Sequence, residues 1–238
     1  MQSKKSKNLK GVITIPGDKS ISHRSVILAS LALGQTVIKG LLKSDDVMKT
    51  IEVMRLFGAK INFKGNETCK INGVGVGGIL EPSQPLDFGN SGTSARLIMG
   101  VVATHPVSAI FTGDESLSKR PMQRILEPLK LFGSDVSCRE DNYLPVIIKG
   151  SKLPIPISYK LELPSAQVKS AILLAGLNTP GTTEVIDKFN TRDHTERLLE
   201  IFGCSIDINF IGKDVILFNN IYHYFFYIYY LELKKINL

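Results

Sequence analysis

Three short segments of the chain share one pattern of apolar and polar positions, centred on a Phe-Gly pair. They read MRLFGAKI from Met54, LKLFGSDV from Leu129 and LEIFGCSI from Leu199. Each closes a stretch whose apolar residues recur at helical spacing, over residues 45–58, 118–133 and 192–203. A glycine after the last apolar turn is typical of a helix C-terminus, where the backbone enters the left-handed region. A β-like run follows each segment, so the pattern predicts three helices that each lead into a strand.

A second set of predicted helices lies upstream of these segments. Residues 20–34, 91–105 and 165–181 begin with serine-rich positions and then become apolar on most sides, which predicts burial. β-like runs over 35–41, 107–113 and 182–188 join the two helices of each unit. The order helix, strand, helix, one or two strands therefore occurs three times. Three unrelated segments with chance Leu-Phe-Gly matches are the alternative, and the repeated order argues against it.

The repeat predicts an α/β (α+β) fold, a single domain of three units whose apolar helices pack together with sheets outside them. We expect units at about 16–80, 81–157 and 158–208, after an N-terminal arm over 1–15. An aromatic-rich tail over 209–238 carries five of the seven tyrosines, and a frameshift or premature end is the preferred interpretation. A membrane anchor is disfavoured because the apolar run 221–230 is shorter than the about 20 residues that span a bilayer. The remaining interpretation is a β-prone tail that packs poorly.

Composition and charge narrow the class of ligand. Of the 238 residues, 43% are hydrophobic and 21% charged, as in globular proteins. The net charge of +7 is spread singly outside the N-terminal arm and is not interleaved with aromatic residues. This distribution favours small anionic substrates over nucleic acid or a membrane surface. Cys69, Cys138 and Cys204 lack metal-ligand spacing and indicate reduced thiols in a cytoplasmic protein.

The three serine-rich helix starts are candidate anion sites. A helix N-terminus offers free N–H groups and a partial positive charge, and each start here also carries a cation: Arg24, Arg96 or Lys169. A fourth cluster, GDESLSKRP, adds Lys119 and Arg120. Taken singly, such serines are most often helix caps and such cations surface charges. Their recurrence in equivalent positions predicts one anion-binding cleft where the helix starts converge.

The histidines give a weaker signal. His23 is more readily explained as a packing or capping residue than as a catalytic one. His194 lies where Thr191 or Asp193 would cap a helix, beside charges that would pair locally. His105 precedes a proline in a predicted turn, and nothing in the sequence indicates a function for it. No Ser–His–Asp arrangement can be assembled from the sequence.

Five motifs resemble one family in order and spacing: GDKSISHRS, LDFGNSGTSARL, GDESLSKRPMQR, PSAQVKSAILLAGLNTPG and TRDHTERLL. From about residue 11 to 206 the chain resembles the EPSP synthases, or 3-phosphoshikimate 1-carboxyvinyltransferases. The residues within its motifs resemble those of the bacterial class II enzymes. The resemblance implies the enolpyruvyl transferase fold and a monomeric cytoplasmic enzyme of the shikimate pathway, without metal or organic cofactor. It implies transfer of the enolpyruvyl group of phosphoenolpyruvate to shikimate 3-phosphate, with release of phosphate.

The resemblance also implies roles for individual residues. Those expected to bind shikimate 3-phosphate are Lys19, Ser20, Arg24, Ser165, Ala166, Gln167 and Arg192. Those expected to bind phosphoenolpyruvate are Lys19, Asn90, Gly92, Thr93, Arg120 and Gln167. A glycine at position 92, where tolerant relatives carry alanine, would admit glyphosate to an intact enzyme.

The sequence departs from the family in extent. Family members have two similar domains around the active site, and only the first is matched, so no catalytic proton-transfer residue is assigned. Two hypotheses follow: an enzyme half that a second chain would complete, or a non-catalytic remnant that binds shikimate 3-phosphate weakly. The sister family of UDP-N-acetylglucosamine enolpyruvyl transferases is a third, against which GDKSISHR and SAQVKSA argue.

Overall fold

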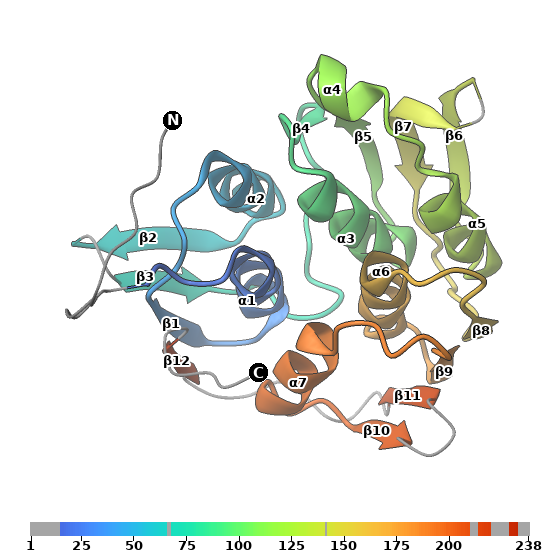
Figure 1. The fold of residues 1–238 in the computed structure, drawn as a ribbon. Helices are drawn as coiled ribbons and strands as arrows, with labels where there is room; N and C mark the ends of the chain where they lie inside the picture. Colours follow the sequence, from blue (N-terminus) through green and yellow to red (C-terminus); the bar gives the residue numbers. More distant parts are fainter. Residues whose placement is uncertain (1–14, 66–67, 141, 210–213, 220–228, 233–238) are drawn as a thin grey trace, which may run out of the picture.

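The computed structural model describes residues 15–65, 68–140, 142–209, 214–219 and 229–232 (Figure 1). The predicted N-terminal arm and most of the predicted tail lie outside these residues. The helices are α1 (Lys19–Leu31), α2 (Asp45–Leu56), α3 (Gly92–Ala103), α4 (Glu115–Ser118), α5 (Gln123–Leu131), α6 (Ala166–Gly176) and α7 (His194–Ile201).

The described strands form three four-stranded sheets. The first has the order β12-β1-β3-β2, from Tyr229–Glu232, Gln35–Lys39, Thr68–Asn72 and Lys60–Lys64. The second has the order β4-β5-β7-β6, from Leu86–Asp87, Ser108–Thr112, Tyr143–Lys149 and Asp135–Arg139. The third has the order β10-β11-β9-β8, from Ile206–Asn209, Asp214–Asn219, Gly181–Ile186 and Ser158–Lys160. In each sheet two strands that follow one another in the chain form an antiparallel pair: β2 and β3, β6 and β7, or β10 and β11. The second strand of each pair also lies antiparallel to β1, β5 or β9, respectively.

The threefold repeat predicted from the sequence is confirmed. The units run α1-β1-α2-β2-β3, α3-β5-α5-β6-β7 and α6-β9-α7-β10-β11. After α2, α5 and α7, the glycines at 58, 133 and 203 have φ of 101°, 92° and 80°, the left-handed backbone that ends these helices. The phenylalanine before each glycine is fully buried, which explains why the Phe-Gly pair recurs.

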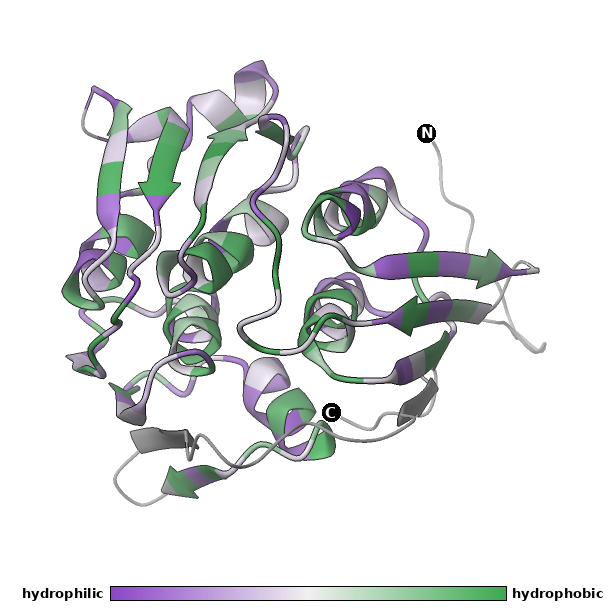
Figure 2. Ribbon diagram, turned by 180° about the vertical axis from the view of Figure 1, so that it is seen from behind, coloured by the Kyte–Doolittle hydropathy of each residue, from purple (hydrophilic) through white to green (hydrophobic). Residues whose placement is uncertain are grey.

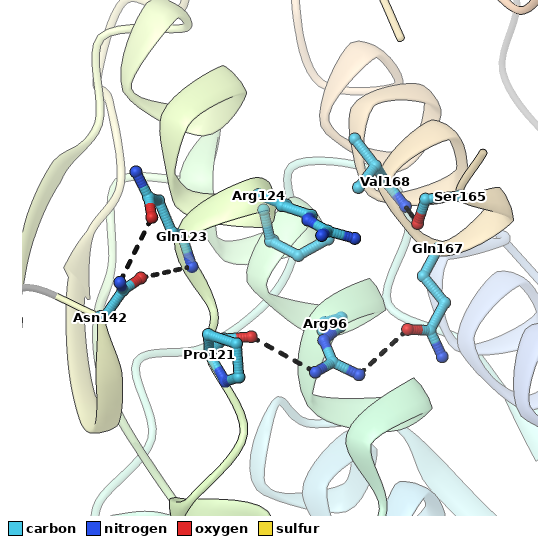
Figure 3. Close-up of a pocket in the computed structure, with 9 residues that line it drawn as sticks. Arg96, Pro121, Gln123, Arg124, Asn142, Ser165, Gln167 and Val168 are labelled. Atoms are coloured by element: carbon cyan, nitrogen blue, oxygen red, sulfur yellow. Dashed lines mark hydrogen bonds between the residues drawn. The ribbon is translucent and has the colours of Figure 1, made fainter. Parts of the chain in front are cut away.

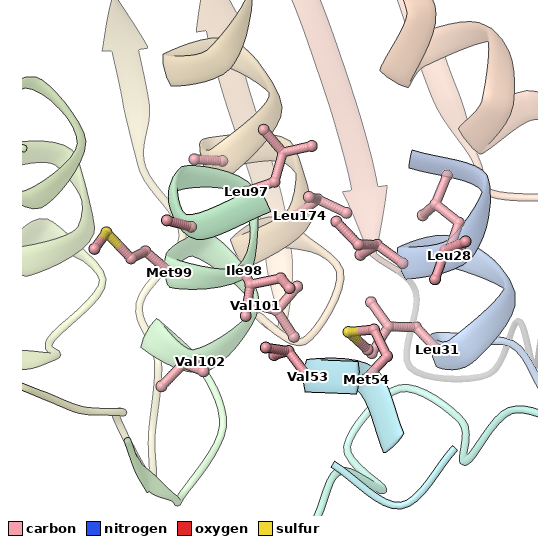
Figure 4. Packing of buried hydrophobic residues seen from close by; sticks show 14 of the residues in the cluster. Leu28, Leu31, Val53, Met54, Leu97, Ile98, Met99, Val101, Val102 and Leu174 are labelled. Carbon is pink, nitrogen blue, oxygen red and sulfur yellow. The ribbon is translucent and has the colours of Figure 1, made fainter. Parts of the chain in front are cut away.

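The first helix of each unit lies inside the domain, as expected, and the sheets lie outside (Figure 1). Side chains of α1, α2, α3 and α6 meet in one apolar cluster (Figure 4), and Figure 2 shows hydrophobic residues along α3 and α6. The helices α3 and α6 approach closely at Gly100, where an added Cβ would lie 2.2 Å from the Ala171 carbonyl oxygen. On β2, alternate side chains face the core, as in a sheet with one solvated face (Figure 2).

One helical prediction is wrong in detail. The apolar pattern over 118–133 suggested one helix, but α4 ends at Ser118 and α5 begins at Gln123. Pro121 lies in the gap and has no N–H to donate, and a proline disfavours helical backbone at the residue before it. The break leaves Arg120 in a loop rather than on a helix face.

Candidate functional site

A cleft of about 690 Å³ lies where the starts of α1, α3 and α6 meet the loop before α7. It is lined by every residue that the family resemblance assigned to shikimate 3-phosphate, together with Asp18, His23, Thr93, Pro164, Phe189, Asn190 and Thr191. The cleft therefore brings together residues that lie far apart in the sequence, from Lys19 to Arg192. The convergence of the helix starts is the arrangement that the repeat predicted.

The serines at two of these starts also cap their helices. Ser91 accepts a hydrogen bond from the backbone N–H of Ser94, and Ser165 accepts one from Val168. Asp18, not a serine, performs this role for α1. The capping and anion-binding interpretations are thus compatible, because a cap uses only one of the free N–H groups of the first turn.

Arg24 is the most deeply engaged cation of the cleft. The residue is 3% exposed, and its guanidinium donates to Thr195 Oγ1 at 2.6 Å, to Ser170 Oγ at 2.7 Å and to Ser20 Oγ at 2.6 Å. Burial lowers the pKa of Arg24 to about 10, so the group is still charged at neutral pH. Most of its donors are used within the protein, which holds α1 against α6 and α7 at the base of the cleft.

His23 makes the matching connection to the other side. It lies within hydrogen-bond distance of Thr50 Oγ1, 2.7 Å from Nδ1, and Thr50 Oγ1 in turn donates to Ser94 Oγ at 2.9 Å. Burial lowers the pKa of His23 to about 4, so the ring is neutral at pH 7. Its Nε2 has no hydrogen-bond partner among the described residues. The geometry supports the packing interpretation of His23 and links α1 to α2 and α3.

Lys169 does not face the cleft, which corrects the expectation for the third helix start. Its Nζ lies 3.0 Å from Asp187 Oδ2 and 2.6 Å from Glu196 Oε1, and it donates to the Thr191 carbonyl at 3.2 Å. All three charged side chains are less than 5% exposed. The lysine is surrounded by α7 and the loop after β9, so its charge is neutralised inside the protein.

The two carboxylates of this ion cluster differ in their surroundings. Burial raises the pKa of Glu196, and its Oε2 has no partner among the described residues. Burial also opposes ionisation of Asp187, but hydrogen bonds from Thr191, Lys169 and the N–H of Phe189 outweigh it and lower the pKa of Asp187. The cluster thereby fixes the loop 187–192 that carries Arg192 into the cleft.

The residues expected to bind phosphoenolpyruvate lie at two places. Lys19, Thr93 and Gln167 line the cleft, whereas Asn90, Gly92 and Arg120 form a separate group beside the start of α3. Arg120 Nη2 donates to Asn90 Oδ1 at 2.6 Å, and a Cβ added at Gly92 would lie 3.4 Å from Arg120 Nη1. This group therefore does not line the same cleft.

Two lysines near these groups have carboxylate partners. Lys19 forms an ion pair with Asp46 of α2. Lys119, which directly follows the exposed turn α4, pairs with Glu115 at 2.5 Å. Of the fourth cationic cluster, Arg120 alone therefore belongs to the group beside the start of α3.

Arg96 lies beside this cleft, and the family resemblance assigned no role to it. Its Nη1 donates to Gln167 Oε1 at 3.1 Å, and Gln167 Nε2 donates to Thr93 Oγ1 at 2.9 Å. Burial, followed by the nearby charges of Arg120 and Arg124, lowers the pKa of Arg96. Its position at the start of α3, equivalent to Arg24 in α1, was the available signal.

The other predicted local charges are confirmed in part. Asp193 pairs with Arg197 at 2.8 Å, one helical turn apart, but Glu196 pairs with buried Lys169 instead. Asp193 occupies the N-cap position of α7 without a capping hydrogen bond from its side chain. His105 has a structural role, because its Nε2 accepts from the N–H of Gly77 at 3.0 Å while Nδ1 lies 2.7 Å from the Val101 carbonyl oxygen.

Two classes of feature are absent from the part of the chain that the structure describes. No group of three His, Cys, Asp or Glu side chains there is arranged to hold a metal ion. No helix within the described ranges has both the length and the apolar character needed to cross a membrane.

Comparisons with known proteins agree with this fold. The profile of a family described as EPSP synthase (3-phosphoshikimate 1-carboxyvinyltransferase) matches residues 3–214. Two relatives named 3-phosphoshikimate 1-carboxyvinyltransferase are similar. That of Parvibaculum lavamentivorans is 55% identical over 84% of this chain and 44% of its own length. That of Paracoccus denitrificans is 54% identical over 87% of this chain and 46% of its own length.

A solved structure gives the same result. The EPSP synthase from Acinetobacter baumannii superposes with a TM-score of 0.85 at 40% identity, over 93% of this chain and 49% of that protein. The chain spans about half the length of the relatives that it matches. Profile, relatives and structure agree with one another, and the chain belongs to the EPSP synthase family.

Proposed function

We propose that the cleft binds shikimate 3-phosphate, that phosphoenolpyruvate binds beside it, and that the chain serves the transfer of the enolpyruvyl group between them. In this reaction the 5-hydroxyl oxygen of shikimate 3-phosphate adds to C2 of phosphoenolpyruvate while C3 takes up a proton and the hydroxyl proton is lost, which gives a tetrahedral intermediate. The C2–O bond to phosphate then breaks as C3 loses a proton and the C2=C3 double bond reforms, so that phosphate leaves with one net proton. Both substrates are anions, which suits the cationic character of the cleft.

The observation that carries this proposal is the composition of the cleft wall. Three cations from two distant segments, Lys19, Arg24 and Arg192, line one cavity with the start of α6. Arg192 is exposed and makes no hydrogen bond or ion pair with another described residue. A phosphate or carboxylate would satisfy such free guanidinium donors bidentately.

Each group then has a distinct part in the proposal. Ser165, Ala166 and Arg192 hold the 3-phosphate, with Lys19, Ser20 and Arg24 on the same ligand. Gln167 lies between the two substrates, and Lys19 contacts both. Asn90, Gly92, Thr93 and Arg120 complete the phosphoenolpyruvate side.

No proton-transfer role is proposed for the histidines. His23 is buried and its pKa is about 4, and burial also lowers the pKa of His194. A group that exchanges protons at neutral pH needs a pKa near 7. Binding of shikimate 3-phosphate without turnover is therefore the second candidate function. It is supported by a cleft that is lined by the cations Lys19, Arg24 and Arg192 and whose histidine His23 has a pKa of about 4.

Calorimetric titration of the chain with shikimate 3-phosphate tests the proposal. We expect saturable binding that weakens about tenfold in Lys19→Gln, because one charged contact is lost. Lys119→Gln, which removes the same charge from exposed α4, should bind like the parent. Absence of saturable binding by the parent chain would overturn the proposal.

Phosphate release then separates the two candidates. With both substrates present, steady release of phosphate by the purified chain would establish turnover and exclude binding alone. Binding without release would support the second candidate.

A further inference from the structure

A second pocket of about 550 Å³ adjoins the cleft, between the loop before α5 and the starts of α3 and α6. Its wall is made by Arg96, Pro121, Gln123, Arg124, Ile125, Asn142, Ser165, Gln167 and Val168 (Figure 3). Only Ser165 and Gln167 also line the cleft. Of the residues that the family resemblance assigned to phosphoenolpyruvate, Gln167 belongs to this pocket. Gly92 and Arg120 lie beside Arg96 at its edge, because a Cβ at Gly92 would lie 3.0 Å from Arg96 Nη1 and the charge of Arg120 acts on Arg96.

The charge of this pocket is entirely positive. Arg96 and Arg124 line it, and no aspartate or glutamate does. The two guanidiniums are close enough that the charge of Arg124 contributes, after burial and Arg120, to lowering the pKa of Arg96. Two like charges on α3 and α5 that repel each other across a cavity are a favourable environment for an anion.

Both arginines retain donors for a ligand. Arg96 uses its terminal nitrogens for Gln167 Oε1 at 3.1 Å and the Pro121 carbonyl at 3.4 Å, and a guanidinium has five N–H groups (Figure 3). Arg124 forms no hydrogen bond or ion pair with another described residue. Glu127 and Glu162 border a smaller pocket that Arg124 also lines, and neither forms an ion pair with it.

The polar groups opposite the arginines are already fixed. Asn142 Oδ1 accepts from the backbone N–H of Gln123 at 3.1 Å, and Asn142 Nδ2 donates to Gln123 Oε1 at 3.2 Å (Figure 3). The start of α5 is therefore held in place without a ligand. A ligand would gain its affinity from the two arginines, on a wall that is already ordered.

We propose that this pocket is a second anion site, for a phosphate dianion, distinct from the substrate cleft and coupled to it through Gln167. An anion on Arg96 holds the guanidinium that in turn holds Gln167, whose Nε2 donates to Thr93 Oγ1 at 2.9 Å in the cleft. Occupation of the second site thus restricts a side chain that the cleft ligand contacts. Ile125 and Val168 make part of the pocket wall apolar, and the organic part of a phosphomonoester would pack against them.

The test is a titration of the whole chain with inorganic phosphate, followed through the NMR signals of the arginine Nε–H groups. We expect the signals of Arg96 and Arg124 to shift saturably with one common dissociation constant. Arg124→Gln should weaken this constant about tenfold, because it removes one of two charged donors. Arg124 is exposed, so this change leaves the core intact, and circular dichroism checks that it does.

Two further variants separate this site from other effects. Lys130→Gln removes one exposed charge from the end of the same helix, and its constant should equal that of the parent. Lys19→Gln weakens the cleft and should leave the phosphate-dependent shifts of Arg96 and Arg124 in place. This outcome is independent of whether shikimate 3-phosphate binds, so failure here and failure of the proposed function are distinguishable.

A second arm of the titration identifies the source of the phosphate group. Equal constants for inorganic phosphate and phenyl phosphate would assign the site to free phosphate, and tighter binding of the ester would assign it to a phosphomonoester. The proposal is overturned if neither ligand shifts the two arginine signals saturably, if Arg124→Gln binds like the parent, or if Lys19→Gln abolishes the shifts.

Discussion

The ion cluster around Lys169 offers the sharpest test of how the cleft is held together. In Lys169→Met the apolar stem of the side chain is retained and the ammonium group is lost. Asp187 keeps its hydrogen bonds from Thr191 and Phe189, whereas Glu196 is left buried, 1% exposed, without its ion-pair partner and with the charge of Arg24, whose pKa it raises, beyond salt-bridge distance. Nearly all of the effect should therefore come from Glu196.

The buried Glu196 can respond to the loss of the ammonium group in two ways, and each has a known cost in the free energy of unfolding. Removing one partner of a buried ion pair costs about 3–5 kcal/mol, because an uncompensated charge remains inside the protein. Glu196 can instead take up a proton, which at pH 7 costs about 3–4 kcal/mol for a group that ionises near pH 4.3 in the unfolded chain. The less costly route limits the loss, so we expect the free energy of unfolding to fall by about 3–4 kcal/mol at pH 7.

Protonation of Glu196 makes the loss of stability in Lys169→Met depend on pH. The folded variant binds a proton on Glu196 that the unfolded chain does not bind at pH 7, so its stability rises as the pH is lowered. Relative to the parent, the loss should shrink by about 1.4 kcal/mol per pH unit until Glu196 is protonated in the parent as well. The direction agrees with the pKa of Glu196, which burial raises in the parent.

Urea unfolding followed by circular dichroism at several pH values measures these quantities. Lys169→Met/Glu196→Gln should recover most of the loss, because the unpaired carboxylate is gone. Lys149→Met, at an exposed position on β7, should change stability by less than about 0.5 kcal/mol. A loss below about 1 kcal/mol at pH 7, or a loss that does not depend on pH, would refute the reasoning.

Three other changes have defined outcomes. Arg24→Lys should lower the free energy of unfolding by about 2–4 kcal/mol, because one ammonium cannot replace the fork of donors that reaches α6 and α7; equal melting temperatures of parent and variant would contradict this. Burial lowers the pKa of His105 to about 4 from an ordinary value near 6.5, so its contribution to stability is complete above pH 6.5 and is lost as the pH falls towards 4, by about 3 kcal/mol. In His105→Gln the acid-dependent part of the unfolding free energy should shrink by that amount, and an unchanged pH profile would exclude His105 as its source. Gly92→Ala would place a Cβ 3.0 Å from Arg96 Nη1 and 3.4 Å from Arg120 Nη1. Calorimetry should therefore show several-fold weaker binding of phosphoenolpyruvate, while the free energy of unfolding changes by less than about 1 kcal/mol. Unaltered affinity would show that these guanidiniums move freely.

The repeated architecture of this protein can be predicted from local signals in its sequence. Helical spacing of apolar residues, glycines that end helices and the buried phenylalanines before them are local signals, and they were sufficient to place three equivalent units in order. The exception at Ser118–Gln123 arose because apolar spacing continues through Pro121, which has no N–H to donate and disfavours helical backbone at the residue before it. The family motifs added the identities of the residues that line the cleft.

The roles of the three equivalent cations, in contrast, depend on contacts between distant parts of the chain. Arg24, Arg96 and Lys169 lie near the starts of equivalent helices, and nothing in their local sequence separates them. Arg24 is buried against Ser170 and Thr195, Lys169 is enclosed by two carboxylates, and Arg96 alone of the three borders the second pocket. The environment of a charge depends on groups brought near it from distant parts of the chain, and those contacts exist only after the helices have packed.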